Sequence, residues 1–172
     1  MDATDLETFV DALIDDLTPV AAREGDRPLF HLLDAPRRGV DDEAVVAVLA
    51  AAVTLRNLAD HVIASAVVAA ERAGIPARRH LRSGADLLTN IGVAPGAAYR
   101  AVRVGRAAHR LSALTRAQRL GGVGIEFADA VGKGVSHIEA RVALTDDERT
   151  EVVTTLMIQS TPSGVDKKAR GI

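Results

Sequence analysis

Ten arginines lie between Arg72 and Leu120, in a stretch whose single acidic residue is Asp86. The stretch carries a formal charge of +9, although the whole chain has a net charge of -2. A local concentration of positive charge is typical of a surface that faces a polyanion such as nucleic acid. The candidate DNA-binding residues are Arg78, Arg79, Arg82, Tyr99, Arg100, Arg103, Arg106 and Arg110.

Four of these arginines belong to a segment, Ala97 to Leu111, in which only Gly105 weakens a helix. At ~100° per residue the segment separates into an apolar arc and a cationic arc, which predicts an amphipathic helix with an arginine-rich outer face. The apolar arc contains Ala101, Val104, Ala108 and Leu111, and the cationic arc contains Arg103, Arg106 and Arg110 with Arg100 beside it.

A shorter helix is predicted just before this one, with Ser83 as its N-cap and Gly92 at its end. Helix, glycine turn and second helix together form a pattern of the helix-turn-helix kind, in which the start of the second helix lies closest to base edges. Tyr99 and the residues from Pro95 to Ala98 would occupy that place, and the arginines would contact phosphates. The alternative is an ordinary helical hairpin with a solvated arginine face, favoured by Leu88 at a position that is usually small in the DNA-binding version.

An enzyme is the third alternative. The best catalytic constellation combines Asp60 with His61 and with His109 or Glu126, but no spacing requires it, and GxSxG is absent. The chain has no cysteine, and its five histidines are scattered without a metal-binding motif. We therefore expect no catalytic residue, no metal site and no cofactor.

The longest predicted element is a helix of about 30 residues from Glu43 to Ala73, because this range contains neither Gly nor Pro. Its apolar run is interrupted from Arg56 to His61, so we expect a buried helix and not a membrane span. Arg56 and Asp60 are spaced to pair along it.

The remaining segments predict further helices. An amphipathic helix is expected over residues 1–18, followed by a loop with a small apolar cluster up to residue 40. Short helices are expected at 115–120 and after Ile125, where Gly132 and Gly134 would loosen or end the helix. A capping box of Thr145 and Glu148 starts another helix. A turn at 161–164 would precede the final helical segment from Asp166.

These elements predict an all-α single domain, 1–172, of six to eight helices with a long central helix and a helix-turn-helix-like pair. Residues 1–40 would form an N-terminal helix and loop, and residues 41–172 the helical core. The absence of cysteine and of a signal peptide favours a cytoplasmic setting.

Three runs, GVAPGAAYRAVRVGRAAHRL, GGVGIEFADAVGKGVSHIE and LTDDERTEVVTTLM, resemble the actinobacterial domain of unknown function 222, the 13E12 repeat family. The resemblance covers roughly residues 45–170. In that family the domain commonly precedes an HNH endonuclease domain, so the resemblance implies a helical, nucleic-acid-associated module. It implies no catalytic residue within these 172 positions, because the histidines and paired cysteines of the nuclease are not among them.

Two functions follow as hypotheses. The first is a non-catalytic DNA-binding module of an HNH endonuclease-type or mobile-element protein. The second is a protein interaction or dimerisation module, because an alanine-rich long helix allows a partner helix to approach closely. Both can hold together, with DNA and a second copy of the chain as partners.

Overall fold

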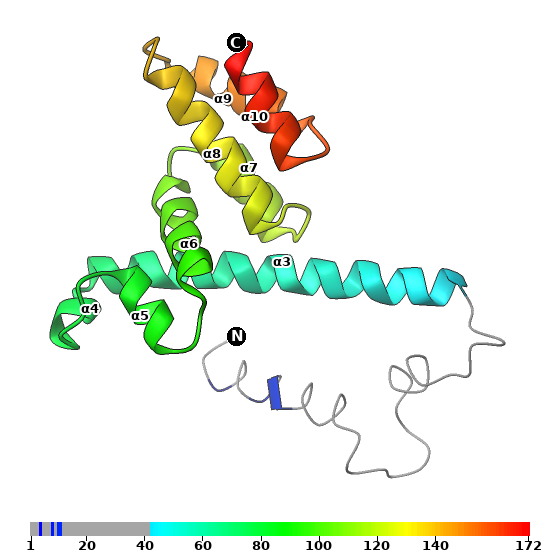
Figure 1. Cartoon of the computed structure of the whole chain (residues 1–172). Helices are drawn as coiled ribbons and strands as arrows, with labels where there is room; N and C mark the ends of the chain where they lie inside the picture. The colour runs from blue at the N-terminus through cyan, green and yellow to red at the C-terminus, as the bar shows by residue number, and fades with distance from the viewer. Residues whose placement is uncertain (1–3, 5–7, 9, 12–41) are drawn as a thin grey trace. The chain divides into compact units, whose positions relative to one another are not determined.

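The computed structural model of this chain describes residues 4, 8, 10, 11 and 42–172. All regular structure in these residues is helical (Figure 1), which confirms the predicted fold class. Thr4, Thr8, Val10 and Asp11 are helical, in agreement with the predicted N-terminal helix. The rest of that helix and the predicted loop up to residue 40 lie outside the described residues.

The described part of the chain between residues 42 and 172 contains eight helices. Two compact units divide the chain, residues 1–52 and residues 53–172, and the boundary falls within the first of these helices. The helices are α3 (Asp42–Arg72), α4 (Ile75–Arg78), α5 (Gly84–Asn90), α6 (Pro95–Ala107), α7 (Ser112–Arg119), α8 (Ile125–Glu139), α9 (Asp146–Met157) and α10 (Pro162–Arg170).

Helix α3 has the predicted length, with Asp42 and Glu43 complementing the helix dipole in its first turn. The prediction that it is buried is wrong for most of its length. Every described side chain from Val45 to Ile63 is exposed or half-buried, and the first buried residue of the helix is Ala64. The reason is that the other helices of the 53–172 unit bury side chains only near the C-terminal end of α3.

By length and composition alone, the part of α3 from Val45 to Arg72 is apolar enough to cross a membrane. One such helix is weak evidence for a span. The polar residues in its middle have protein partners: Asn57 donates to the carbonyl of Gly121 at 2.8 Å, and Arg56 donates to Glu126 at 3.1 Å. These contacts fit a helix that packs through its polar positions.

The core of the 53–172 unit is centred on α8. Val131 and Val135 of this helix are buried with Leu156 of α9 and Val165 of α10. The predicted interruption at Gly132 and Gly134 is wrong, because α8 runs through both glycines. Packing explains this: a Cβ at Gly134 would lie 3.1 Å from the Cβ of Ala169, so the glycine allows α10 to lie close against α8 (Figure 1).

Helix α6 crosses the C-terminal part of α3 at a second glycine. A Cβ placed on Gly105 would lie 2.1 Å from the main-chain oxygen of Ala64 and 2.7 Å from Val68. The helix-weakening glycine of the sequence is therefore the point at which two backbones meet.

Helix caps follow the sequence with two differences. Thr145 and Glu148 form the predicted capping box, and the Ser83 hydroxyl accepts from the amide of Asp86 at 3.2 Å. The predicted turn at 161–164 is wrong, because Thr161 caps α10 by accepting from the amide of Gly164 at 3.1 Å. Helix α7 begins earlier than predicted, at Ser112.

Candidate nucleic-acid interface

Helices α5 and α6 form the predicted pair around a glycine turn. Gly92 has a φ of 97°, a left-handed conformation that glycine adopts without steric cost. The amide of Val93 donates back to the carbonyl of Leu88 at 3.0 Å, and Pro95 then opens α6. Leu88 is buried, so the large side chain before the turn becomes part of the core of this pair.

The start of α6 is open. Gly96, Ala97 and Tyr99 are exposed, with 54% of Tyr99 accessible, while Ala98 between them is fully buried. Around Gly96, no atom lies within 4 Å of where a Cβ would be. Of the residues predicted to approach base edges, Ala98 is therefore part of the core, and Gly96, Ala97 and Tyr99 are open to solvent.

The arginines of α6 differ from this, because each has a carboxylate partner on another helix. Arg103 binds Asp129 of α8 through Nε and Nη2, both at 2.9 Å. Arg106 binds Glu71 of α3 in the same two-bonded way, at 3.0 and 2.8 Å. The sequence predicts a cationic outer face. In the structure, carboxylates of α3 and α8 pair with the arginines of that face.

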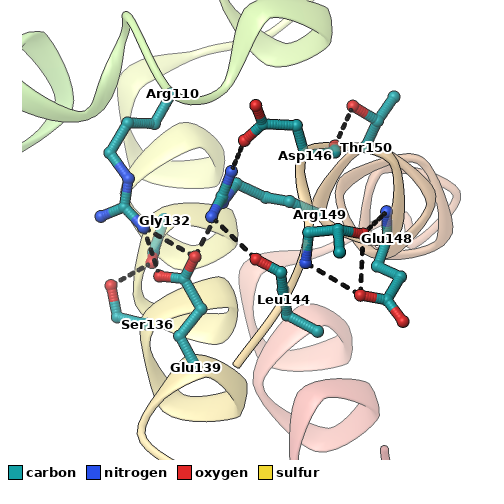
Figure 2. A network of polar contacts seen from close by, with 10 residues as sticks. Arg110, Gly132, Ser136, Glu139, Leu144, Asp146, Glu148, Arg149 and Thr150 are labelled. Atoms are coloured by element: carbon teal, nitrogen blue, oxygen red, sulfur yellow. Dashed lines mark hydrogen bonds and ion pairs between the residues drawn. The ribbon is translucent and has the colours of Figure 1, made fainter. Parts of the chain in front are cut away.

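Arg100 and Arg110 continue the pattern. Arg100 donates to Glu126 at 3.1 Å, and Arg110, which follows α6, donates to Glu139 at 2.6 Å. Figure 2 shows Glu139 between Arg110 and Arg149 of α9, whose Nε lies 2.7 Å from it. This network ties three segments together at the C-terminal end of α8.

The ion pairs shift the titration of their acids. Burial opposes ionisation of Asp129, but hydrogen bonds from Arg103 and Lys133 outweigh it and lower its pKa. The hydrogen bond from Arg106 lowers the pKa of Glu71. These acids are therefore ionised at neutral pH, and the surface along α6 is of mixed sign instead of a continuous arginine surface.

A second group of basic residues, which we name the basic segment, precedes α5. Its exposed members are Arg72, Arg78, Arg79, His80 and Arg82. Within the described residues, no carboxylate pairs with the guanidinium of Arg72, Arg79 or Arg82. Arg78 donates to the carbonyl of Ala73 at 2.5 Å. In the described part of the chain, the charges of Arg72, Arg79 and Arg82 are therefore not compensated by an ion pair.

The backbone fixes the basic segment in place. Gly74 and His80 both have positive φ, 69° and 58°, and Pro76 between them is buried. The amide of Arg82 donates to Asp86 at 3.2 Å, which links the segment to the first turn of α5. A non-glycine residue in the left-handed region marks a constrained turn.

The catalytic constellation finds no support in the described residues. Asp60 lies 3.8 Å from Arg56, and Glu126 is held by Arg56 and Arg100. No hydrogen bond or ion pair joins His61 or His109 to either acid. Among the described residues, no group of three or more His, Cys, Asp or Glu side chains could hold a metal ion.

Sequence reasoning missed the acids that pair with the arginines, which are Glu71, Glu126, Asp129 and Glu139. A signal was present, because the acid-poor stretch from Arg72 to Leu120 is flanked on both sides by acids. Folding brings those flanks against the stretch that lacks them.

No family model matches this chain, and no match is found among the curated proteins or the solved structures.

Proposed function

We propose that this chain is a non-catalytic DNA-binding helical module that uses the basic segment and the pair α5–α6. The observation that carries the proposal is the uncompensated charge of Arg79 and Arg82 beside the N-terminus of α5. In helix-turn-helix proteins the first helix of the pair crosses the phosphate backbone, and the start of the second reaches base edges. In this proposal the basic segment, which leads into α5, contacts the phosphate backbone, and the exposed start of α6 approaches the bases.

The roles of the candidate residues divide accordingly. Arg78, Arg79 and Arg82 bind phosphates, and Tyr99 lies closest to the bases. Arg100, Arg103, Arg106 and Arg110 have carboxylate partners, so a phosphate contact from them competes with an existing ion pair. Their part in DNA binding stays a prediction.

The resemblance to the 13E12 repeat family adds a context to this proposal. The module would deliver an HNH endonuclease-type or mobile-element protein to DNA in the cytoplasm. This part rests on the three sequence runs alone.

Binding to random-sequence duplex DNA at low and moderate salt tests the proposal. We expect affinity to fall steeply as salt rises, because neutralised phosphates release counterions. The double variant Arg79→Gln/Arg82→Gln should lower the salt slope by about two units. Its matched control is Arg116→Gln/Arg119→Gln, two exposed arginines of α7 from the same cationic stretch. No binding at low salt, or an equal effect of both double variants, would contradict the proposal.

A dimerisation module is the second candidate, favoured by one observation on α3. Val46, Leu49 and Val53 are 63%, 59% and 56% exposed. Their spacing of three and four residues is that of the a and d positions at which two helices pack together. Light scattering over a concentration series tests this, with Leu49→Asp as the variant. A monomer mass at all concentrations would contradict dimerisation.

A further inference from the structure

A half-open cavity of about 570 Å³ is lined by residues of α6, α7 and α8 and of the link between α6 and α7, all within the 53–172 unit. Its volume is within the range of small-molecule sites, which are roughly 300–1,000 Å³. The apolar part of its wall includes Val104, Leu111 and Leu114, which belong to the core cluster. Neither the DNA-binding proposal nor the sequence reasoning assigns it a role.

Gln118 is the unusual residue of this wall. It follows Leu114 by one helical turn on the buried face of α7, where an apolar residue would be expected, and only 2% of it is exposed. Among the described residues, its amide nitrogen, Nε2, has no hydrogen-bond partner. Buried polar groups almost always have a partner, so this donor requires an explanation. Because the terminal torsion of glutamine is broad, the amide can turn its nitrogen toward the cavity at low cost.

The hydroxyl groups of Thr115 and Ser136 in the wall already donate to the main chain. Thr115 donates to the carbonyl of Ala108 at 2.9 Å, and Ser136 donates to the carbonyl of Gly132 at 3.0 Å. Both hydroxyl protons are therefore engaged in hydrogen bonds to the main chain and are not available to a ligand. The donors that remain are the Gln118 amide and the unused N–H groups of the cations.

Cations dominate the charged part of the cavity wall. Arg103, Arg106, Arg110 and Lys133 contribute to it, with Asp129 as the single acid and His109 and His137 as further lining groups. An arginine has five N–H donors, and an ion pair with a carboxylate uses only some of them. A ligand in this cavity would meet apolar walls, the amide of Gln118 and the N–H groups that these cations do not use in their ion pairs.

We infer that this cavity is a binding site for a small organic anion with an apolar body, of which the carboxylate or phosphate would meet the cations. Gln118 donates to an acceptor atom of this ligand, and the aliphatic part lies against Leu111 and Leu114. The site is separate from the basic segment, so the inference does not depend on DNA binding.

The test is titration of the isotope-labelled full chain, followed by amide chemical shifts, with hexanoate, hexyl phosphate and the neutral hexan-1-ol as probes. We expect saturable shifts in α6, α7 and α8, and affinity for at least one anion about tenfold above that for the alcohol. Which anion binds more tightly distinguishes a carboxylate from a phosphate ligand. Equal affinity for hexan-1-ol and both anions, or no saturable binding, would overturn the inference.

A variant that fills the cavity makes the test specific. Gly132 lines the cavity, and a Cβ there would meet only Leu111, at 3.9 Å. Gly132→Leu should therefore fold and abolish binding, while Gly132→Ala, which adds one methyl group, should retain it. Binding unchanged in Gly132→Leu would place the probe elsewhere, for example on the apolar face of α3, and would overturn the inference.

Two polar variants test the recognition itself. Gln118→Glu replaces the amide donor by a carboxylate of similar size and should weaken anion binding about tenfold or more. Lys133→Gln should weaken binding of the two anions and leave binding of hexan-1-ol unchanged. Lys167→Gln, at an exposed position of α10, is the matched control and should change the affinity for neither probe. An equal loss for anion and alcohol in Gln118→Glu and Lys133→Gln would contradict recognition of charge.

Discussion

Arg103 of α6 and Asp129 of α8 are joined by two parallel hydrogen bonds, each 2.9 Å long. The side chain of Asp129 is 8% exposed and that of Arg103 is 49% exposed, so a buried acid holds an arginine that reaches the surface. Lys133 and Arg100 approach the same carboxylate at 2.8 and 3.9 Å. Asp129 therefore links the arginines on the outer face of α6 to α8, the central helix of the core.

Asp129→Asn should lower the free energy of unfolding by about 2 kcal/mol, because the substitution removes the buried charged acceptor of the hydrogen bonds from Arg103 and Lys133. Chemical denaturation with equal m values for both proteins would measure it. The control is Asp166→Asn, which removes the exposed pair with Arg170 and should change stability by less than about 0.5 kcal/mol. Equal effects of the two substitutions would contradict the role given to Asp129.

The free energy of unfolding should decrease in acid, because the pKa values of Glu71 and Glu139 are lowered in the folded state. Hydrogen bonds from Arg106 and from the main-chain amide of Gly84 lower the pKa of Glu71 below its ordinary value of 4.5. For Glu139, burial acts against ionisation, but hydrogen bonds from Arg149 and Arg110 outweigh it and also lower the pKa. A lowered pKa means that the stabilisation is fully present above the ordinary value and is lost as pH falls through the value of the folded state.

Denaturation measured between neutral pH and about pH 3 would show this loss. The double variant Glu71→Gln/Glu139→Gln should be less stable than the parent at neutral pH and should lose less stability in acid. A parent and variant with parallel pH profiles would contradict the assignment.

Asp60 should behave in the opposite way. Burial raises its pKa, although Arg56 at 3.8 Å acts in the other direction, and no described residue forms a hydrogen bond with its Oδ2. A raised pKa means that the folded state disfavours the ionised form, so ionisation of Asp60 reduces stability as pH rises through that value. Asp60→Asn should therefore raise the melting temperature at neutral pH, and the gain should disappear in acid. A variant less stable than the parent at neutral pH would show that the ion pair with Arg56 dominates.

The close crossing of α3 and α6 predicts a contrast between two glycines of the same helix. Gly105→Ala places a methyl group against the main-chain oxygen of Ala64, which cannot move aside, and should cost about 3 kcal/mol or more. Gly96→Ala meets no atom within 4 Å and should be neutral or stabilising by up to about 1 kcal/mol. Thermal unfolding of both variants measures the contrast. Equal effects would mean that the helices do not cross at Gly105.

Local signals in the sequence were enough to predict the helices and several of their ends. The glycine turn at Gly92, the capping box at Thr145 and the length of α3 each depend on a few neighbouring residues, and each is confirmed. The continuity of α8 through Gly132 and Gly134 depends instead on contacts with α10. Glycine has a low intrinsic helix propensity, so the sequence alone predicts a helix end here. In the fold, the missing side chain of Gly134 allows close packing against α10.

The candidate site shows the same division. The amphipathic pattern placed the arginines of α6 on an outer face, and Arg103 and Arg106 are indeed exposed. Their partners, Asp129 and Glu71, lie 26 and 35 residues away in sequence, and no periodicity within one helix could reveal them. Pairing across helices therefore separates the arginines that serve the fold from those of the basic segment.

This separation gives the last prediction, which compares two sets of arginines by two measurements. Arg103→Gln/Arg106→Gln should lower the free energy of unfolding by about 1–2 kcal/mol, because partly exposed ion pairs to Asp129 and Glu71 are lost. It should lower the salt slope of DNA binding by less than about one unit, because these guanidinium groups are already neutralised. Arg79→Gln/Arg82→Gln should show the reverse, a stability within about 0.5 kcal/mol of the parent and a slope lower by about two units. The prediction would be contradicted if Arg103→Gln/Arg106→Gln reduced the salt slope of DNA binding more than Arg79→Gln/Arg82→Gln did and left stability unchanged. The arginines of α6 would then be the phosphate contacts, and their ion pairs would not contribute to stability.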